Sequence, residues 1–431
     1  MKNNVTIIGA GLAGCEAALT LANHGIKVTL FEAKPKRTSP AHHSSDFAEV
    51  VCSNSFKSND PCTAGGLIKQ ELRILGSELI AVADSVKVPA GGALAVDRSK
   101  FSRIVTQKIN SNSNITVVNE VVEQLDLSNP TIIATGPLTL TPLAETLSHL
   151  FGKSLYFYDA AAPIISAESI DFSSAFTASR YGKGDDDYIN CPLSRDEYYT
   201  FVNELLSAQR ADLHEFEKGE IFEGCMPVEV MASRGVDTLR FGPLKPVGII
   251  DPKTDKRPFA VVQLRKENES GSMLNIVGFQ TNLKFVEQKR VFGLIPALKN
   301  AEFLKYGVMH RNMYIDAPKT INKHFALKNH PKCFIAGQLS GVEGYVESIA
   351  SGLIAALNMK KFLYGEGPIN LPDCTMLGAL SAYLERPNED FQPMNANFGL
   401  LPPLSEHVRD KSLRKKALSD RAIEQMKDIV I

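Results

Sequence analysis

The chain has 431 residues, of which 44% are hydrophobic and 22% charged, and its formal net charge at pH 7 is −1. This length indicates two or three domains, and the composition is that of an ordinary soluble protein. The seven cysteines form no C-x-x-C pair, which argues against a disulfide framework or a metal site and favours the cytoplasm. No apolar run is long enough to span a bilayer, so no membrane association is expected. A nucleic-acid partner would have to bind local basic patches rather than a global field.

The first 35 residues read as a dinucleotide-binding βαβ unit. A strand over 5–8 leads into the loop Gly9-Ala10-Gly11-Leu12-Ala13-Gly14, then a helix, then a strand that ends on Glu32. Gly9 allows the tight turn, Gly11 lets the backbone approach a pyrophosphate, and Gly14 lets the helix pack closely. The free N–H groups at the helix start face the phosphates, and Glu32 can accept a hydrogen bond from a ribose hydroxyl. The alternative is a glycine turn without a ligand.

The next segments alternate between loops, helices and strands. Residues 36–66, with adjacent His42 and His43, form a long polar stretch typical of a functional loop. Periodicity and capping then predict a helix over 67–83, a turn over 90–93, a helix over 97–109 capped by Asp97, and strands over 115–118 and 131–135.

The alternation of strands and helices typical of a Rossmann fold ends at about residue 140 and resumes near residue 318. A strand over 333–336 runs into a second glycine loop with Gly337, Gly341 and Gly344, followed by a helix of small residues over 348–356. A second loop of this kind suits a cofactor as long as FAD. We therefore predict an α/β fold, a Rossmann-like, glutathione-reductase-like FAD-binding domain built from residues 1–140 and 318–431. Residues 141–317 form an inserted α+β domain, and residues 411–427 an exposed amphipathic helix.

Two cysteines lie in loops shaped for chemistry. Cys52 sits in the polar loop, and Cys225 has a glycine before it and a proline two residues after it. A thiol suits a step in which a nucleophile must add and later leave, although a small buried hydrophobe is the alternative at each position. Tyr345 could stack on a ring or cap a helix. His310 could neutralise an anion or be purely structural.

Several longer motifs occur in a defined order along the whole chain. Besides the first glycine loop, these are Val51–Ser55, Gly91–Arg98, Gly224–Glu229, Arg240–Pro246, Ile276–Thr281, His310–Asn312, Gly341–Tyr345 and Met394–Pro403. With this set, the chain resembles from end to end the bacterial folate- and FAD-dependent tRNA (uracil-5-)-methyltransferases. Because several motifs are long and unusual, the resemblance is specific.

The resemblance implies a reaction and its participants. Methylenetetrahydrofolate donates a one-carbon unit, which is carried on flavin N5 to C5 of a uridine in the tRNA T-loop, and NAD(P)H supplies the reducing equivalents. Uracil C5 becomes nucleophilic only when a thiolate adds at C6, and a second group must then remove the C5 proton. The family's two cysteines match Cys225, favoured as the nucleophile, and Cys52, favoured as the proton-handling partner, with the reverse left open. Tyr345 and His310 would support flavin or folate.

Departures from the family pattern keep other functions open. Phe285-Val286 follows Leu283-Lys284 where an aromatic-glycine pair is usual, and unusual residues follow Cys52 and His310. These differences concern segments that could touch RNA or folate, so the same chemistry on a uridine of large-subunit rRNA is one alternative. A non-catalytic FAD-containing partner in RNA modification and a simple NAD(P)H–flavin oxidoreductase are the others.

Overall fold

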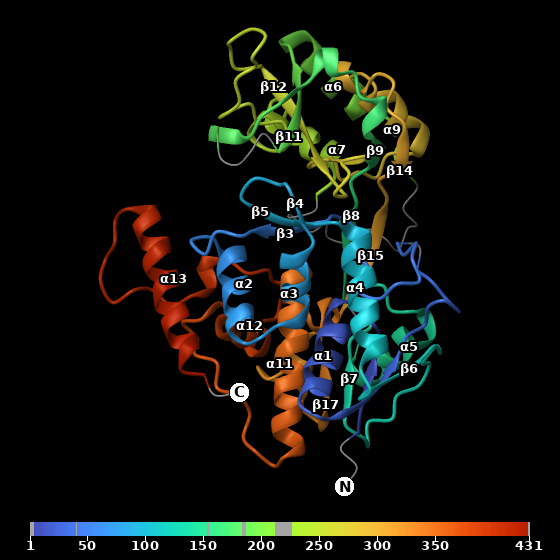
Figure 1. Ribbon diagram of the computed structural model, residues 1–431, viewed down its shortest axis with the longest axis vertical. Helices are drawn as coiled ribbons and strands as arrows, with labels where there is room; N and C mark the ends of the chain where they lie inside the picture. Colours follow the sequence, from blue (N-terminus) through green and yellow to red (C-terminus); the bar gives the residue numbers. More distant parts are fainter. Residues whose placement is uncertain (1–3, 40, 153–154, 183–186, 212–225, 430–431) are drawn as a thin grey trace.

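The computed structural model describes residues 4–39, 41–152, 155–182, 187–211 and 226–429. Two hydrophobic cores organise it, one in each of two bodies that we call the lower and the upper body (Figure 1). Residues before about 152 and after about 313 build the lower body, and residues 164–305 build the upper one. The fold class predicted from the sequence, a Rossmann-like α/β fold joined to an α+β part, is confirmed.

A six-stranded sheet forms the centre of the lower body. Its strands lie in the order β16-β17-β7-β1-β2-β6, and all neighbours pair in parallel except β16 with β17. The bounds are β1 Asn4–Ile8, β2 Lys27–Phe31, β6 Ile115–Val118, β7 Thr131–Ile133, β16 Ala326–Leu327 and β17 His330–Ile335. Because β1 lies between β2 and β7, the loop that leaves β1 opens at the carboxyl edge of the sheet, where such folds bind ligands.

Two long helices pack tightly beside this sheet. These are α1 (Leu12–Asn23) and α11 (Tyr345–Leu363). A Cβ atom added to Gly352 would lie 2.3 Å from the carbonyl oxygen of Ala13, so the small-residue stretch of α11 is what allows the close approach. The remaining helices of the lower body are α2 Ala64–Ile74, α3 Glu78–Ser85, α4 Arg98–Ser111, α5 Thr141–Phe151, α10 Ala317–Thr320, α12 Met376–Glu385 and α13 Lys411–Lys427.

The structure confirms the helix cap predicted at Asp97 but not the single helix predicted over 67–83. Asp97 caps α4 by accepting a hydrogen bond from the backbone N–H of Lys100, as predicted. The single helix predicted over 67–83 is wrong, because α2 ends at Ile74 and α3 begins at Glu78. Gly76 adopts φ +73°, and the Ser77 side chain accepts a hydrogen bond from the N–H of Ile80. The apolar spacing continues through this break, which is why periodicity alone missed it.

The upper body is an antiparallel sheet with helices on it (Figure 1). The strand order is β10-β11-β12-β13-β9-β14. Its strands and helices are β9 Ile164–Ser166, β10 Phe176–Thr177, β11 Tyr188–Leu193, β12 Ala260–Lys266, β13 Met273–Ile276, β14 Phe303–Lys305, α6 Arg195–Ser207, α7 Val228–Ser233, α8 Thr238–Phe241 and α9 Phe285–Phe292.

Two smaller sheets lie between the bodies. An antiparallel ribbon of β8 (Leu155–Ala160) and β15 (Met309–Tyr314) carries the chain out of the lower body and back. A three-stranded sheet of β3 (Ser55–Ser58), β4 (Lys87–Val88) and β5 (Ala93–Val96) covers the top of α2 and α3 (Figure 1). Cys52 lies just before β3, and His310 lies on β15, so both occupy the junction of the two bodies.

Candidate active site

The first glycine loop combines close packing at two positions with open space at a third. Gly9 adopts φ +101°, and an added Cβ would lie 2.5 Å from the carbonyl oxygen of Ala134. At Gly14 an added Cβ would lie 1.8 Å from the carbonyl oxygen of Gly9, whereas at Gly11 it would meet no atom within 4 Å. No side chain caps the start of α1 at Gly11. The free N–H groups of this helix therefore face a space that an anionic group could fill.

A cleft with an empty volume of about 760 Å³ opens beside this loop. Glu32, at the end of β2, lines it. Its carboxylate accepts hydrogen bonds from the N–H groups of Ala10 (2.8 Å) and Lys34 (2.9 Å). These bonds fix the carboxylate and leave lone pairs on its oxygens for a ribose hydroxyl. The donor set, the open position at Gly11 and the placed carboxylate fit the pyrophosphate and ribose of a dinucleotide such as FAD.

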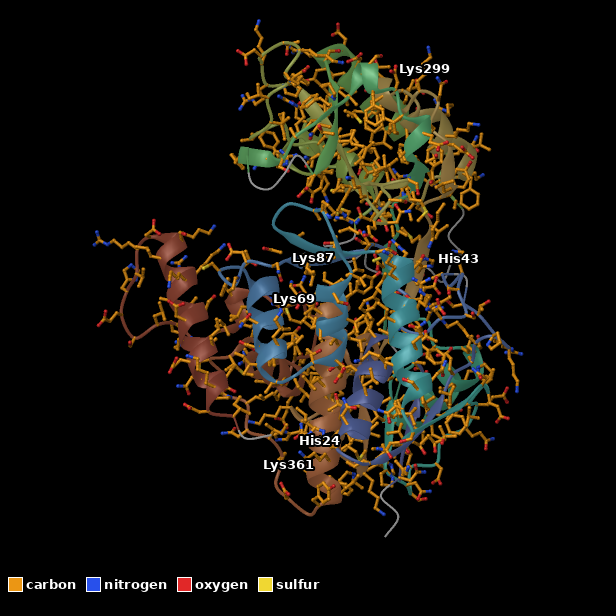
Figure 2. The ribbon with its side chains drawn as sticks, in the orientation of Figure 1. His24, His43, Lys69, Lys87, Lys299 and Lys361 are labelled. Atoms are coloured by element: carbon orange, nitrogen blue, oxygen red, sulfur yellow. The ribbon has the colours of Figure 1, made fainter. Side chains whose placement is uncertain are left out.

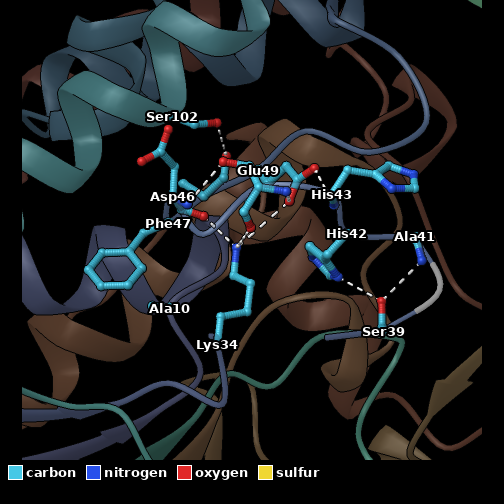
Figure 3. A network of polar contacts seen from close by, with 12 residues as sticks. Ala10, Lys34, Ser39, Ala41, His42, His43, Asp46, Phe47, Glu49 and Ser102 are labelled. Carbon is cyan, nitrogen blue, oxygen red and sulfur yellow. Dashed lines mark hydrogen bonds and ion pairs between the residues drawn. The ribbon is translucent and has the colours of Figure 1, made fainter. Parts of the chain in front are cut away.

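The loop over 41–49 closes one side of the cleft, and Lys34 organises it (Figure 3). The Lys34 ammonium donates to the carbonyl oxygens of Ser44 and Asp46 and lies 3.8 Å from the Glu49 carboxylate. Glu49 also accepts from the backbone N–H groups of residues 43 and 44, and the Ser39 hydroxyl bonds the His42 ring at 2.7 Å. Residues 41–49 of the stretch predicted as a functional loop are thus held by a network of part-buried and exposed polar contacts.

In the second glycine loop, neighbouring protein atoms already occupy the space that side chains at the glycine positions would need. The three predicted glycines all adopt positive φ, at +76° for Gly337, +91° for Gly341 and +116° for Gly344. An added Cβ would lie 3.2 Å from Ala13 Cβ at the first, 2.5 Å from the Phe391 ring at the second, and 2.3 Å from the Glu347 carboxylate at the third. Glycine is therefore required here for backbone conformation and packing. Cofactor contacts by these three residues stay a prediction.

Tyr345, the first residue of α11, holds Cys52. Its hydroxyl accepts hydrogen bonds from the N–H groups of Cys52 (2.8 Å) and Ser53 (3.2 Å) and donates to the Cys52 Sγ atom at 3.2 Å. One donor and two acceptor sites are the whole capacity of a phenolic hydroxyl. The ring leans against Phe56, with ring centroids 5.8 Å apart. Tyr345 is thus a positioning residue for the thiol, and its predicted stacking on flavin or folate stays a prediction.

A half-buried arginine on the lower body fixes the chain just before Cys52. The Arg98 guanidinium, at the start of α4, donates to the carbonyl oxygens of Val50 (2.6 Å) and Val51 (3.1 Å). Its other face binds the buried carboxylate of Glu267 at 2.8 Å. Lys305 adds a second donor to the carbonyl oxygen of Val51, at 3.3 Å. Because Glu267 and Lys305 belong to the upper body, this contact joins both bodies at the candidate site.

The residues after Cys52 are anchored to β12 of the upper body. Arg265 donates to the Ser53 hydroxyl (2.9 Å) and to the Asn54 side-chain oxygen (3.1 Å), and Asn54 donates to the carbonyl oxygen of Lys266. Arg265 is therefore buried at a protein contact. Further along, Lys69 (Figure 2) is also buried and donates to three carbonyl oxygens, two of them in β3.

The electrostatic surroundings keep the Cys52 thiol protonated at neutral pH. Burial, and then the negative charge of Asp159, raise the pKa of Cys52 to about 12, while the hydrogen bond from Tyr345 opposes the rise. His310 faces Asp159 in the β8–β15 register. Burial, followed by the positive charges of Lys305 and two other histidines, lowers the pKa of His310 to about 4. Burial also raises the pKa of Glu343 to about 8. The site thus holds a neutral thiol and a neutral imidazole.

The structure brings together some of the residues predicted from the sequence. Cys52 and Tyr345 are in contact, and His310 lies on the strand paired with Asp159. Cys225 lies outside the described residues. Sequence reasoning missed the roles of Glu267 and Asp159, because no local motif marks them and only strand register places them. Arg98 lies within the motif Gly91–Arg98, and this motif was the sequence signal that could have marked its role.

Together, the fold and the site define a Rossmann-type dinucleotide-binding protein whose second body completes a cysteine site. Comparison with known proteins makes this specific. A family model described as glucose inhibited division protein A matches residues 4–367. A methylenetetrahydrofolate–tRNA-(uracil-5-)-methyltransferase TrmFO of Acetivibrio thermocellus is 53% identical over 432 residues, covering 100% of this chain and 99% of that protein.

A relative of the same name from Aquifex aeolicus is 52% identical over 427 residues, covering 99% of this chain and 96% of that protein. The chain therefore belongs to the glucose inhibited division protein A family and, within it, to the TrmFO branch. The solved structure of Aquifex aeolicus GidA superposes with a TM-score of 0.71 at 16% identity, covering 99% of this chain and 73% of that one, which supports the fold. Among the helices in the described residues, none is long and apolar enough to cross a membrane.

Proposed function

We propose that this chain transfers a one-carbon unit from methylenetetrahydrofolate to C5 of a uridine in the tRNA T-loop. The product is 5-methyluridine, FAD is the bound cofactor, and NAD(P)H is the reductant. The observation that carries the proposal is the 53% identity over the full chain to a relative named for this activity. The relatives described above are named for tRNA, so the rRNA alternative receives no support from them. The described geometry supplies a cleft that fits the cofactor and a positioned thiol nearby.

In this proposal the residues around the first glycine loop hold the cofactor. The N–H groups at the start of α1 bind its pyrophosphate through Gly11, and the Glu32 carboxylate binds a ribose. When bound, FAD supplies the redox chemistry of the one-carbon transfer. The insertion predicted over residues 141–317, which contains the upper body, contributes to the folate and RNA site, because its Glu267, Arg265 and Lys305 already hold the Cys52 loop.

The two cysteines take different roles. Cys225 is proposed as the nucleophile that adds to C6 of the uracil, since Cys52 is a poor resident nucleophile while its pKa stays near 12. Cys52 must first give up its own proton, and its thiolate, whose pKa is raised, is then a strong acceptor for the C5 proton. Tyr345 and Arg98 keep the Cys52 sulfur in place, one through its hydroxyl and the other through the preceding carbonyl groups. His310, which lies on β15 opposite Asp159 of β8, supports the folate.

The test is a methylation assay with the purified, FAD-loaded protein. We expect 5-methyluridine in an unmodified tRNA transcript when methylenetetrahydrofolate and NADPH are present, measured by mass spectrometry of nucleosides. Cys52→Ala and Cys225→Ala should each lower the rate at least about 100-fold with FAD retained. Cys62→Ala, at a free cysteine with a different environment, is the matched control and should leave the rate unchanged. A wild-type protein that contains FAD but forms no 5-methyluridine in tRNA would refute the proposal.

A further inference from the structure

The C-terminal helix α13 carries cations that have no counter-charge in the described part of the chain. Residues 409–427 contain seven Lys and Arg residues and three Asp and Glu residues. Lys416 pairs with Asp420, Lys427 pairs with Glu424, and Arg421 donates to two backbone carbonyl groups. The other four cations form no ion pair with a described carboxylate: Arg409, Lys411, Arg414 and Lys415. We call these four the α13 basic patch.

The placement of this patch is unfavourable for the isolated helix. Three of its members lie in or next to the first turn of α13, where the helix dipole favours negative charge and four neighbouring cations repel one another. Asp410, the carboxylate between Arg409 and Lys411, is used to cap the helix by accepting from the N–H of Leu413. Arg409, Lys411 and Arg414 are exposed, and Lys415 lies 6.0 Å from the centre of the Phe398 ring. A bound polyanion would remove this repulsion.

The patch is physically connected to the candidate site. The Ser419 hydroxyl of α13 donates to the carbonyl oxygen of Pro61, nine residues after Cys52, so the helix is fixed to the segment that leaves the thiol. Nine residues span at most about 32 Å. The tail also pairs with the second glycine loop, where the N–H of Glu343 donates to Met394 and the N–H of Ala396 donates to Glu347. Figure 1 shows α13 on the flank of the lower body, its first turn directed toward the upper body.

We propose that the α13 basic patch binds the phosphate backbone of the RNA substrate. This inference rests on the proposed function for the identity of the RNA. The helix that carries the patch is bonded through Ser419 to Pro61, which lies within about 32 Å of Cys52, so the patch would hold a further part of the RNA whose uridine reaches the thiol. Its cations have no described carboxylate partners to displace, so each would release counterions when RNA binds. Cations of this kind give affinity without sequence specificity.

The test compares two triple variants of the full FAD-loaded protein. Arg409→Gln/Lys411→Gln/Arg414→Gln removes three patch charges, and Arg290→Gln/Lys319→Gln/Lys427→Gln removes three charges that are paired elsewhere. The dissociation constant of a tRNA transcript is measured from 50 to 200 mM salt. We expect the patch variant to bind about 10-fold more weakly or worse, with a salt slope smaller by about 2–3, and the control to match wild type. FAD content and melting temperature should be unchanged in both.

The outcomes separate this inference from the proposed function. If wild type methylates tRNA but the patch variant keeps its affinity and salt slope, the patch does not bind RNA while the function stands. If the patch variant loses RNA affinity although wild type forms no 5-methyluridine, the surface stands and the function is wrong. Binding of wild type to anionic phosphatidylglycerol vesicles, lost in the patch variant with RNA affinity unchanged, would overturn the inference in favour of a membrane contact.

Discussion

The two glycine loops are similar in sequence but have different roles in the structure. Each follows a strand of the same parallel sheet and leads into a helix rich in small residues. At Gly11 the space that a side chain would occupy is empty, so the start of α1 faces an open cleft. At Gly344 that space is filled by Glu347 and Lys57, and the next residue, Tyr345, uses its hydroxyl on Cys52. One loop offers room for a ligand, and the other positions a reactive side chain.

The prediction with the largest expected effect tests the close packing at Gly14 in the first loop. In Gly14→Ala the new Cβ would lie 1.8 Å from the carbonyl oxygen of Gly9, so the strand and helix must separate. We expect the free energy of unfolding to fall by about 3 kcal/mol or more, with loss of bound flavin. Chemical denaturation followed by circular dichroism measures the change. Gly367→Ala is the matched control, because this glycine, like Gly14, has no positive φ, and the added Cβ meets no atom within 4 Å.

The second prediction tests the positioning role of the other loop. Tyr345→Phe leaves the N–H groups of Cys52 and Ser53 without their shared acceptor, which should cost about 1–3 kcal/mol of stability. The methylation rate should fall about 10- to 100-fold, because the thiol is no longer held. Loss of the hydrogen bond should also raise the pKa of Cys52 further, so alkylation of this thiol should require higher pH. Tyr383→Phe, whose hydroxyl bonds Gln392, is the control. An unchanged alkylation profile would contradict the assignment.

The third prediction tests the open space at Gly11 in the first loop. Gly11 has φ −75°, which alanine adopts without strain, and the added methyl group meets no protein atom. Gly11→Ala should therefore keep the stability of the apoprotein within about 0.5 kcal/mol. The methyl group would occupy the cleft, so FAD affinity should weaken about 10-fold or more, measured by flavin fluorescence titration. Equal FAD affinity in wild type and variant would show that the pyrophosphate does not approach this residue.

The smallest effect concerns pH. The pKa of His310 is lowered to about 4, mainly by burial, so between pH 6.5 and 4 the unfolded chain binds a proton that the folded protein does not. Stability from this group is therefore full above pH 6.5 and is lost as pH falls toward 4. His310→Gln should reduce the loss of unfolding free energy between pH 6.5 and 5.5 by about 1 kcal/mol. Denaturation at both pH values measures it, with His24→Gln as the control. A variant that loses as much stability as wild type would refute the role.

Much of the lower body follows from local sequence signals. The first βαβ unit, the Asp97 cap and the return of the sheet near residue 330 are marked by glycine spacing, capping chemistry and apolar runs. The break between α2 and α3 was missed, because Gly76 interrupts an apolar spacing that otherwise continues. Long motifs also indicated the family, and the identity to relatives confirms that reading.

The sequence by itself determined the dinucleotide-binding start of the fold, since a tight turn, a close helix and a terminal acid each require particular residues at fixed spacing. Only the tertiary structure decided which groups surround Cys52. Tyr345 is 293 residues away, Arg265 lies on β12 of the other body, and Glu267 directly follows that strand. Contacts across such separations depend on how the sheets dock, which leaves no periodic or local trace in the chain. The same docking sets the burial that holds the thiol neutral.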